Sequence, residues 1–194
     1  MKNQYVFVVA ILLLGSFLVQ CKSKTDLQPE RERIDFNKGG IQLMDTLVPK
    51  IHGKWNLSQV EFKIRYQPAT GSVKKDTIFK NFATLEITNI SRSEDQRYPL
   101  CDGRLVLDGK VWNMQFRLWP AAERVAEQTG PQAFTLFEWH FPTGTHVWQE
   151  DELFFRDLQL AGENYAIHYD YRNNTMIWKG LNRDVKEIKL VKMQ

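Results

Sequence analysis

Cysteine is nearly absent from this sequence, which holds only Cys21 and Cys101 in 194 residues. A small secreted fold stapled by disulfides needs several cysteine pairs, so we expect the folded part to be held by its apolar core. A Gly-x-Ser-x-Gly nucleophile elbow and a phosphate-binding glycine loop are also missing. Cys101 has no histidine near it in the sequence and is interpreted as a buried or merely free thiol. We therefore expect no enzymatic activity and no cofactor.

An excess of one charge is lacking as well. The chain has 26 basic and 23 acidic residues, a formal net charge of +3, and the charges are spread evenly. So small a surplus gives no electrostatic basis for binding nucleic acid or for strong attraction to a membrane surface. We expect no nucleic-acid partner.

The four histidines are candidate metal ligands. His140 and His146 flank a turn, and a three-residue loop would place their imidazoles opposite each other. A two-residue loop at Thr143-Gly144 pairs Trp139 with Trp148 instead, which is the more favourable cross-strand arrangement and sends His140 to the other face. We prefer this second register and expect no metal site.

Long hydrophobic runs are absent except at the start, where Lys2 is followed by an apolar segment at 5–19. At about 15 residues the segment is short for a membrane-spanning helix, which needs roughly 20, and it is typical of a signal peptide. It ends at Leu18-Val19-Gln20-Cys21. This junction resembles a bacterial lipobox, although Gln20 stands where Gly or Ala is usual. The resemblance implies a signal peptide at 1–20 and an acylated (palmitate-bearing) Cys21; the alternative is an uncleaved N-terminal anchor.

Residues 21–50 are mostly polar and contain Pro29 and the pair Gly39-Gly40. This composition predicts a flexible tether between the lipid and the folded domain, which we place at 51–194. The remaining residues are enough for one domain with a sizeable core. Aromatic residues are plentiful, with six Trp, twelve Phe and six Tyr, and each brings a large area to bury.

Alternation of apolar and polar residues predicts β-strands over most of the domain. In 110–118 every second residue is apolar, namely Trp112, Met114, Phe116 and Leu118. The preceding Asp108-Gly109 is typical of a type I′ hairpin turn and pairs Leu107 with Lys110. With this turn, the apolar residues of 110–118 and those of the strand before it lie on the same face of the hairpin.

A second hairpin is predicted around Asn173-Asn174, with Tyr171 opposite Met176 and Tyr169 opposite Trp178. His168 would lie on the polar face, opposite Lys179. Further strands are predicted at 55–66, 85–90, 133–141, 145–149, 154–160 and 185–191, and a single short helix at 121–128. The fold class is all-β: an antiparallel up-and-down β-barrel, with a β-sandwich as the alternative.

The stretch Gly53-Lys54-Trp55 opens the first strong strand. Its apolar parity changes after Leu57, and a one-residue β-bulge near Ser58-Gln59 would keep both sets of side chains inward. The Gly-x-Trp motif, with the lipobox and the β-meander, resembles the lipocalin-like lipoproteins of Bacteroidota. The resemblance implies an outer-membrane lipoprotein whose barrel floor is formed by Gly53 and Trp55. It also implies a cation over the indole, for which the candidates are Arg183, Lys186 and Lys189.

Two functions remain open at this point. In the first, the barrel binds a small apolar ligand, with these candidate lining residues: Trp112, Met114, Phe116, Tyr169 and Trp178. In the second, the interior is solid, and the protein is a structural or accessory lipoprotein that contacts another envelope protein. The outward cross-strand pair of Val106 and Val111 is the feature that favours a covered outer surface. In both, the protein is attached to the membrane through Cys21, on the periplasmic side or at the cell surface.

Overall fold

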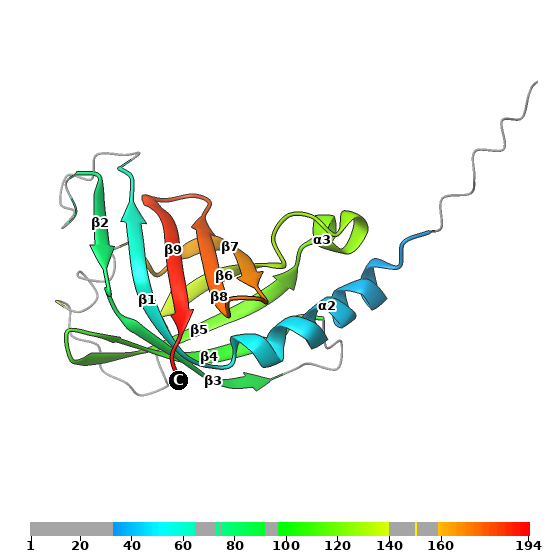
Figure 1. Ribbon diagram of the computed structural model, residues 1–194, viewed down its shortest axis with the longest axis horizontal. Helices are drawn as coiled ribbons and strands as arrows, with labels where there is room; N and C mark the ends of the chain where they lie inside the picture. The colour runs from blue at the N-terminus through cyan, green and yellow to red at the C-terminus, as the bar shows by residue number, and fades with distance from the viewer. Residues whose placement is uncertain (1–32, 65–72, 74, 92–96, 140–149, 151–158) are drawn as a thin grey trace, which may run out of the picture. The chain divides into compact units, whose positions relative to one another are not determined.

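The computed structural model describes residues 33–64, 73, 75–91, 97–139, 150 and 159–194 (Figure 1). Residues 34–194 belong to one compact unit. Its strands are β1 Gly53–Phe62, β2 Thr77–Lys80, β3 Thr84–Ser91, β4 Leu100–Leu107, β5 Lys110–Pro120, β6 Ala133–Trp139, β7 Glu163–Asp170, β8 Thr175–Gly180 and β9 Val185–Lys192. Its helices are α2 Phe36–Ile51 and α3 Ala122–Glu127.

The strands form a closed antiparallel barrel. Each strand from β3 to β8 pairs with the next in the chain, and β1 pairs with both β3 and β9 to close the ring. Strand β2 continues the line of β3, because both pair with β1 along the same edge, β3 at Gly53–Asn56 and β2 at Gln59–Phe62. The prediction of an all-β up-and-down barrel is confirmed, and the sandwich alternative is wrong because the sheet has no break between two layers.

Within the described ranges the predicted strands at 55–66, 85–90, 133–141 and 185–191 correspond to β1, β3, β6 and β9. The hairpin at Asp108-Gly109 is confirmed with Leu107 opposite Lys110. Both turn residues have positive φ, 50° and 79°. The strand predicted at 145–149, the hairpin at 139–148 and most of the strand predicted at 154–160 lie outside the described residues.

The second hairpin is present, but its predicted register was wrong by two residues. Tyr169 lies opposite Met176, and His168 lies opposite Ile177 rather than Lys179. The turn is longer because the Asp170 carboxylate accepts hydrogen bonds from the backbone N–H groups of Arg172 and Asn173 and from the Asn173 side chain. Such Asx-type bonding ends the strand early. Because the register shifts by two residues, the strand residues that were predicted to face inward still do so.

The β-bulge in β1 is confirmed. Leu57 pairs with Leu190 and Gln59 with Lys189, which leaves Ser58 as the extra residue. Trp55 and Leu57 before the bulge and Val60 and Phe62 after it are all buried. The bulge therefore keeps every large apolar side chain of the strand inside the barrel.

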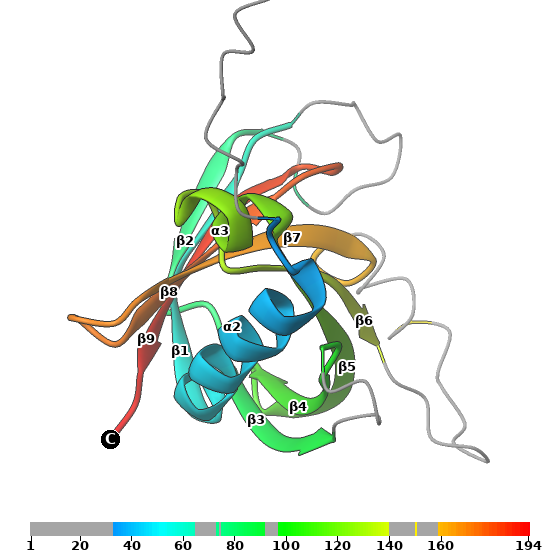
Figure 2. The ribbon, with the colours of Figure 1, turned by 90° about the vertical axis from the view of Figure 1, so that its right-hand side faces the viewer.

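Helix α2 overturns part of the tether prediction. Residues 36–51 are helical, with Asp35 as N-cap accepting from the N–H groups of Asn37 and Lys38. Its buried apolar side chains are Met44, Leu47, Val48 and Ile51. They belong to the same core as the barrel interior, so this segment is part of the folded unit. Figure 2 looks toward the barrel end across which α2 lies, with α3 beside it.

The second helix, α3, is confirmed at Ala122–Glu127, close to its predicted span. None of the helices in the described part of the chain is both long enough and apolar enough to cross a membrane.

The tight turn of the first hairpin leads to a prediction. An added Cβ at Gly109 would meet no atom within 4 Å, so only the positive φ resists a side chain there. Gly109→Val should lower the free energy of unfolding by at least about 1 kcal/mol, because a β-branched residue is strained in this conformation. Gly109→Asn is the matched control and should cost less, since Asn tolerates it. Equal midpoints of chemical denaturation for the two variants would contradict the turn assignment.

Candidate functional site

The candidate lining residues all point into the barrel. Their exposed fractions are 6% for Trp112, 1% for Met114, 1% for Phe116, 4% for Tyr169 and 2% for Trp178. A void beside them wide enough for water would leave part of each side chain accessible, so the interior around them is filled. Their inward orientation is confirmed, and their contact with a ligand stays a prediction.

Aromatic rings fill the middle of the barrel around Trp178. Its ring centroid lies 5.6 Å from that of Phe116, 5.4 Å from Phe137 and 5.6 Å from Tyr165. The pairs with Phe116 and Phe137 are edge-to-face and the pair with Tyr165 is tilted, and such contacts add to the stabilisation from buried apolar area. The indole Nε1 of Trp178 is buried with no acceptor among the described residues, a cost of roughly 1–3 kcal/mol that this cluster must offset.

Trp55 lies at the helix-covered end of the barrel. Its side chain is fully buried, and its Nε1 donates to the carbonyl of Ile51, the last residue of α2, at 2.7 Å. Gly53 has a φ of 110°, a conformation that favours glycine and lets the chain turn from α2 into β1. The indole thus joins the helix to the first strand.

The cation over the indole is Lys192, and not Arg183, Lys186 or Lys189. Its Nζ lies 5.3 Å from the centroid of the Trp55 ring and donates to the Lys50 carbonyl at 2.8 Å. Lys186 and Lys189 instead form ion pairs on the outer face, with Glu61 and Glu187. Lys192 lies on the same face of β9 as the buried Ile188 and Leu190. The alternation along β9 therefore indicates that its side chain starts on the inward face.

A cavity of about 400 Å³ lies outside the barrel interior, among α2, α3 and the turn after β7; we name it the end cavity. Helix α2 contributes one face with helical spacing: Gly39, Gln42, Leu43 and Thr46. This face is adjacent to the one that packs into the core. The volume falls in the range of small-molecule sites, about 300–1,000 Å³.

The opposite wall is formed by Arg124 and Val125 of α3 and by its C-cap residue, Gln128. The two helices touch at Gly39, where an added Cβ would lie 2.4 Å from Cγ1 of Val125. A larger residue at this position would force the Val125 side chain or the helices to shift. Gly39 therefore allows α2 and α3 to pack closely beside the cavity.

Gln132 and Tyr171 complete the wall. The buried Gln132 amide donates to the Tyr169 carbonyl at 3.1 Å and accepts from the Tyr169 N–H at 2.8 Å. The Tyr169 ring lies 4.8 Å from the ring of Tyr171, which is 43% exposed. The Gln132 amide thus holds the end of β7, and Tyr171 follows directly from it.

Arg124 is the charged residue among those that line the end cavity. Its two Nη atoms donate to the carbonyls of Gln128, at 2.6 Å, and of Gly130. Burial raises the pKa of Tyr171, and the positive charge of Arg124 acts in the opposite direction. Burial and then Lys179 lower the pKa of His168, with Arg124 contributing less.

The sequence predicted none of the residues that line the end cavity. The spacing of Met44, Leu47, Val48 and Ile51 was the available indication that α2 exists. Cys101 is confirmed as a buried free thiol, and burial raises its pKa to about 12. Within the described ranges no cluster of three or more His, Cys, Asp or Glu residues could hold a metal ion. His140 and His146 lie outside those ranges.

Comparisons of the chain with protein-family models, with curated proteins and with solved structures found no match.

The packed interior leads to a second prediction. Trp55→Ala and Trp178→Ala should each lower the free energy of unfolding by about 3–5 kcal/mol, the range for truncating a buried aromatic side chain. Trp119→Ala is the matched control, because Trp119 is 40% exposed on β5, and it should cost about 1 kcal/mol or less. Chemical denaturation of the three variants measures these costs. A large loss at Trp55 with a small loss at Trp178 would instead indicate a hollow barrel.

Proposed function

We propose that this protein is a non-catalytic, lipid-anchored protein of the cell envelope, similar to lipocalin-like lipoproteins, that binds a small ligand in the end cavity. The cavity itself is the observation that supports this function. It has the volume of a ligand site, and its lining combines apolar and polar side chains. The barrel interior, by contrast, is filled by its own aromatic rings.

Two contacts support the walls of the end cavity in the absence of a ligand. Gly39 lets α2 pack closely against Val125 of α3, and the Gln132 amide holds the end of β7 by two hydrogen bonds. A preformed site does not have to order its own side chains when the ligand binds, so less of the contact energy is lost.

The lipid anchor rests on the sequence from Leu18 to Cys21. Cys21→Ser should yield an unprocessed or soluble precursor, because the acylated thiol is lost. Cell fractionation and the migration of the protein on a gel measure both effects. Cys101→Ala is the control and should fractionate like the wild type. If Cys21→Ser stays with membranes and migrates like the mature wild type, the lipobox interpretation is wrong.

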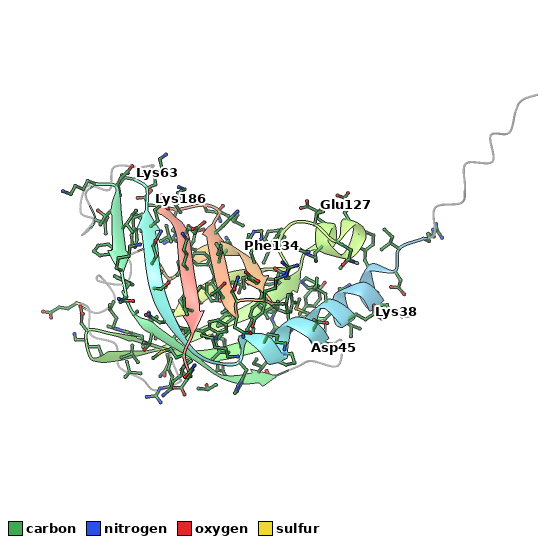
Figure 3. All side chains as sticks on the ribbon, in the orientation of Figure 1. Lys38, Asp45, Lys63, Glu127, Phe134 and Lys186 are labelled. Atoms are coloured by element: carbon green, nitrogen blue, oxygen red, sulfur yellow. The ribbon has the colours of Figure 1, made fainter. Side chains whose placement is uncertain are left out.

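A second function is favoured by one surface feature. Trp119 on β5 and Phe134 on β6 form an outward cross-strand pair and are 40% and 37% exposed (Phe134 is labelled in Figure 3). Paired aromatic residues on an outer face are typical of protein interfaces. In this alternative the protein is an accessory lipoprotein that binds another envelope protein through this pair.

Filling the end cavity distinguishes the two functions. Thr46 is exposed on α2, and its hydroxyl bonds to the Gln42 carbonyl of its own helix. Thr46→Trp should therefore leave the fold intact, occupy the cavity and weaken small-molecule binding at least tenfold. Ligand-observed NMR against a library of small amphipathic molecules measures this. Lys38→Trp, on the same helix but outside the cavity lining, is the control (Figure 3). A protein partner lost in Phe134→Asp, with no small ligand found, would support the accessory function instead.

A further inference from the structure

Arg124 brings a positive charge to the end cavity that no described acidic side chain neutralises. Its hydrogen bonds go to two backbone carbonyls, those of Gln128 and Gly130, which carry no net charge. The side chain is half-buried, so water solvates it only in part. A cation in such a place is stabilised when an anion reaches it.

Two acidic side chains of these elements, Asp170 and Glu123, make hydrogen bonds to other groups. The Asp170 carboxylate accepts three hydrogen bonds within the turn after β7. The Glu123 carboxylate accepts from the Thr129 hydroxyl and lies against Gly130. Among the described residues no ion pair involves Arg124, so an anion from solution can pair with it.

The guanidinium is also oriented in advance. Its two carbonyl bonds hold the plane of the group, and Nε is buried with no acceptor among the described residues. Arginine offers five donors in a rigid fork that matches the paired oxygens of a carboxylate or a phosphate. Each Nη atom carries a second hydrogen that the carbonyl bonds do not use, and these two N–H groups are the donors left for a ligand oxygen.

The rest of the lining sets the character of the ligand's body. Leu43, Val125 and the Tyr171 ring provide apolar surface, and Gln42 and Gln128 provide neutral polar groups. The volume of about 400 Å³ is at the small end of the range for ligand sites. The body that fits is short and apolar.

We propose that the end cavity binds a small organic anion, with a carboxylate or phosphate group against Arg124 and a short apolar body against Leu43, Val125 and Tyr171. This inference rests on the proposal that the end cavity is the ligand site.

The test compares four probes of equal chain length on the purified full chain: hexanoate, hexyl phosphate, 1-hexanol and hexylamine. NMR titration gives each dissociation constant. The anions should bind at least tenfold more tightly than the alcohol, and the amine most weakly, because the headgroup charge is the difference among them. The dissociation constants of hexanoate and hexyl phosphate show whether the site prefers a carboxylate or a phosphate.

Variants of Arg124 test whether this side chain causes the preference for anions. Arg124→Gln should bring the anions within about twofold of 1-hexanol while the alcohol binds as before, which also shows that the cavity still forms. Arg124→Lys keeps the charge and should keep part of the preference. Arg104→Gln, on the exposed face of β4, is the control and should change nothing.

Two results would overturn the inference without touching the proposed function. In the first, 1-hexanol binds as tightly as hexanoate and both are lost in Thr46→Trp, so the cavity binds ligands without regard to charge. In the second, the anion preference survives in Arg124→Gln, so another group selects the charge. Failure of all four probes to bind would also overturn it, and the library screen with Thr46→Trp would then decide the proposed function separately.

Discussion

The indole of Trp55 lies where three separate parts of the chain meet. Its N–H is bonded to the last residue of α2, its backbone belongs to β1, and the ammonium group over its ring comes from Lys192 at the end of β9. Closure of the ring needs β1 to pair with β9, and these strands are far apart in sequence. The indole is therefore buried only when helix, first strand and last strand are all in place. Removing it would leave a cavity and an unpaired carbonyl at the same point.

Helix α2 links the closed end of the barrel to the end cavity. One face of the helix buries Met44, Leu47 and Ile51 against the barrel, and the adjacent face lines the cavity. Gly39 lies on that second face and packs closely against Val125 of α3. The position of the cavity thus depends on the same helix that Trp55 anchors, and a change that loosens the anchor would alter the cavity as well.

The sequence predicted what depends on strand alternation and turn chemistry. The Asp108-Gly109 turn, the bulge at Ser58 and the inward set on β5 all follow from local patterns. The register of the second hairpin did not, because the Asp170 side chain competes with the backbone for the turn N–H groups. Helix α2 was missed because Gly39-Gly40 and Pro49 are poor helix formers, and tertiary packing overrides their propensity. No local sequence pattern indicates the role of Gln132, because this role depends on two hydrogen bonds to Tyr169 in β7, far along the chain.

The aromatic core lies inside the barrel, whereas the end cavity lies outside it, so largely different residues serve stability and the proposed binding. The aromatic cluster around Trp178 belongs to the core inside the barrel, so exposed residues of the end cavity such as Gln42 and Thr46 can change with little effect on the closure of the ring. The cavity has α2 on one side and α3 and the end of β7 on the other. A ligand that contacts both sides binds only when α2 is docked, and by linkage it stabilises the docked helix. Helix α2 is also the first element of the folded unit, the one nearest in sequence to Cys21. Occupancy of the end cavity would therefore be expected to affect first the segment through which the proposed lipid anchor connects to the barrel.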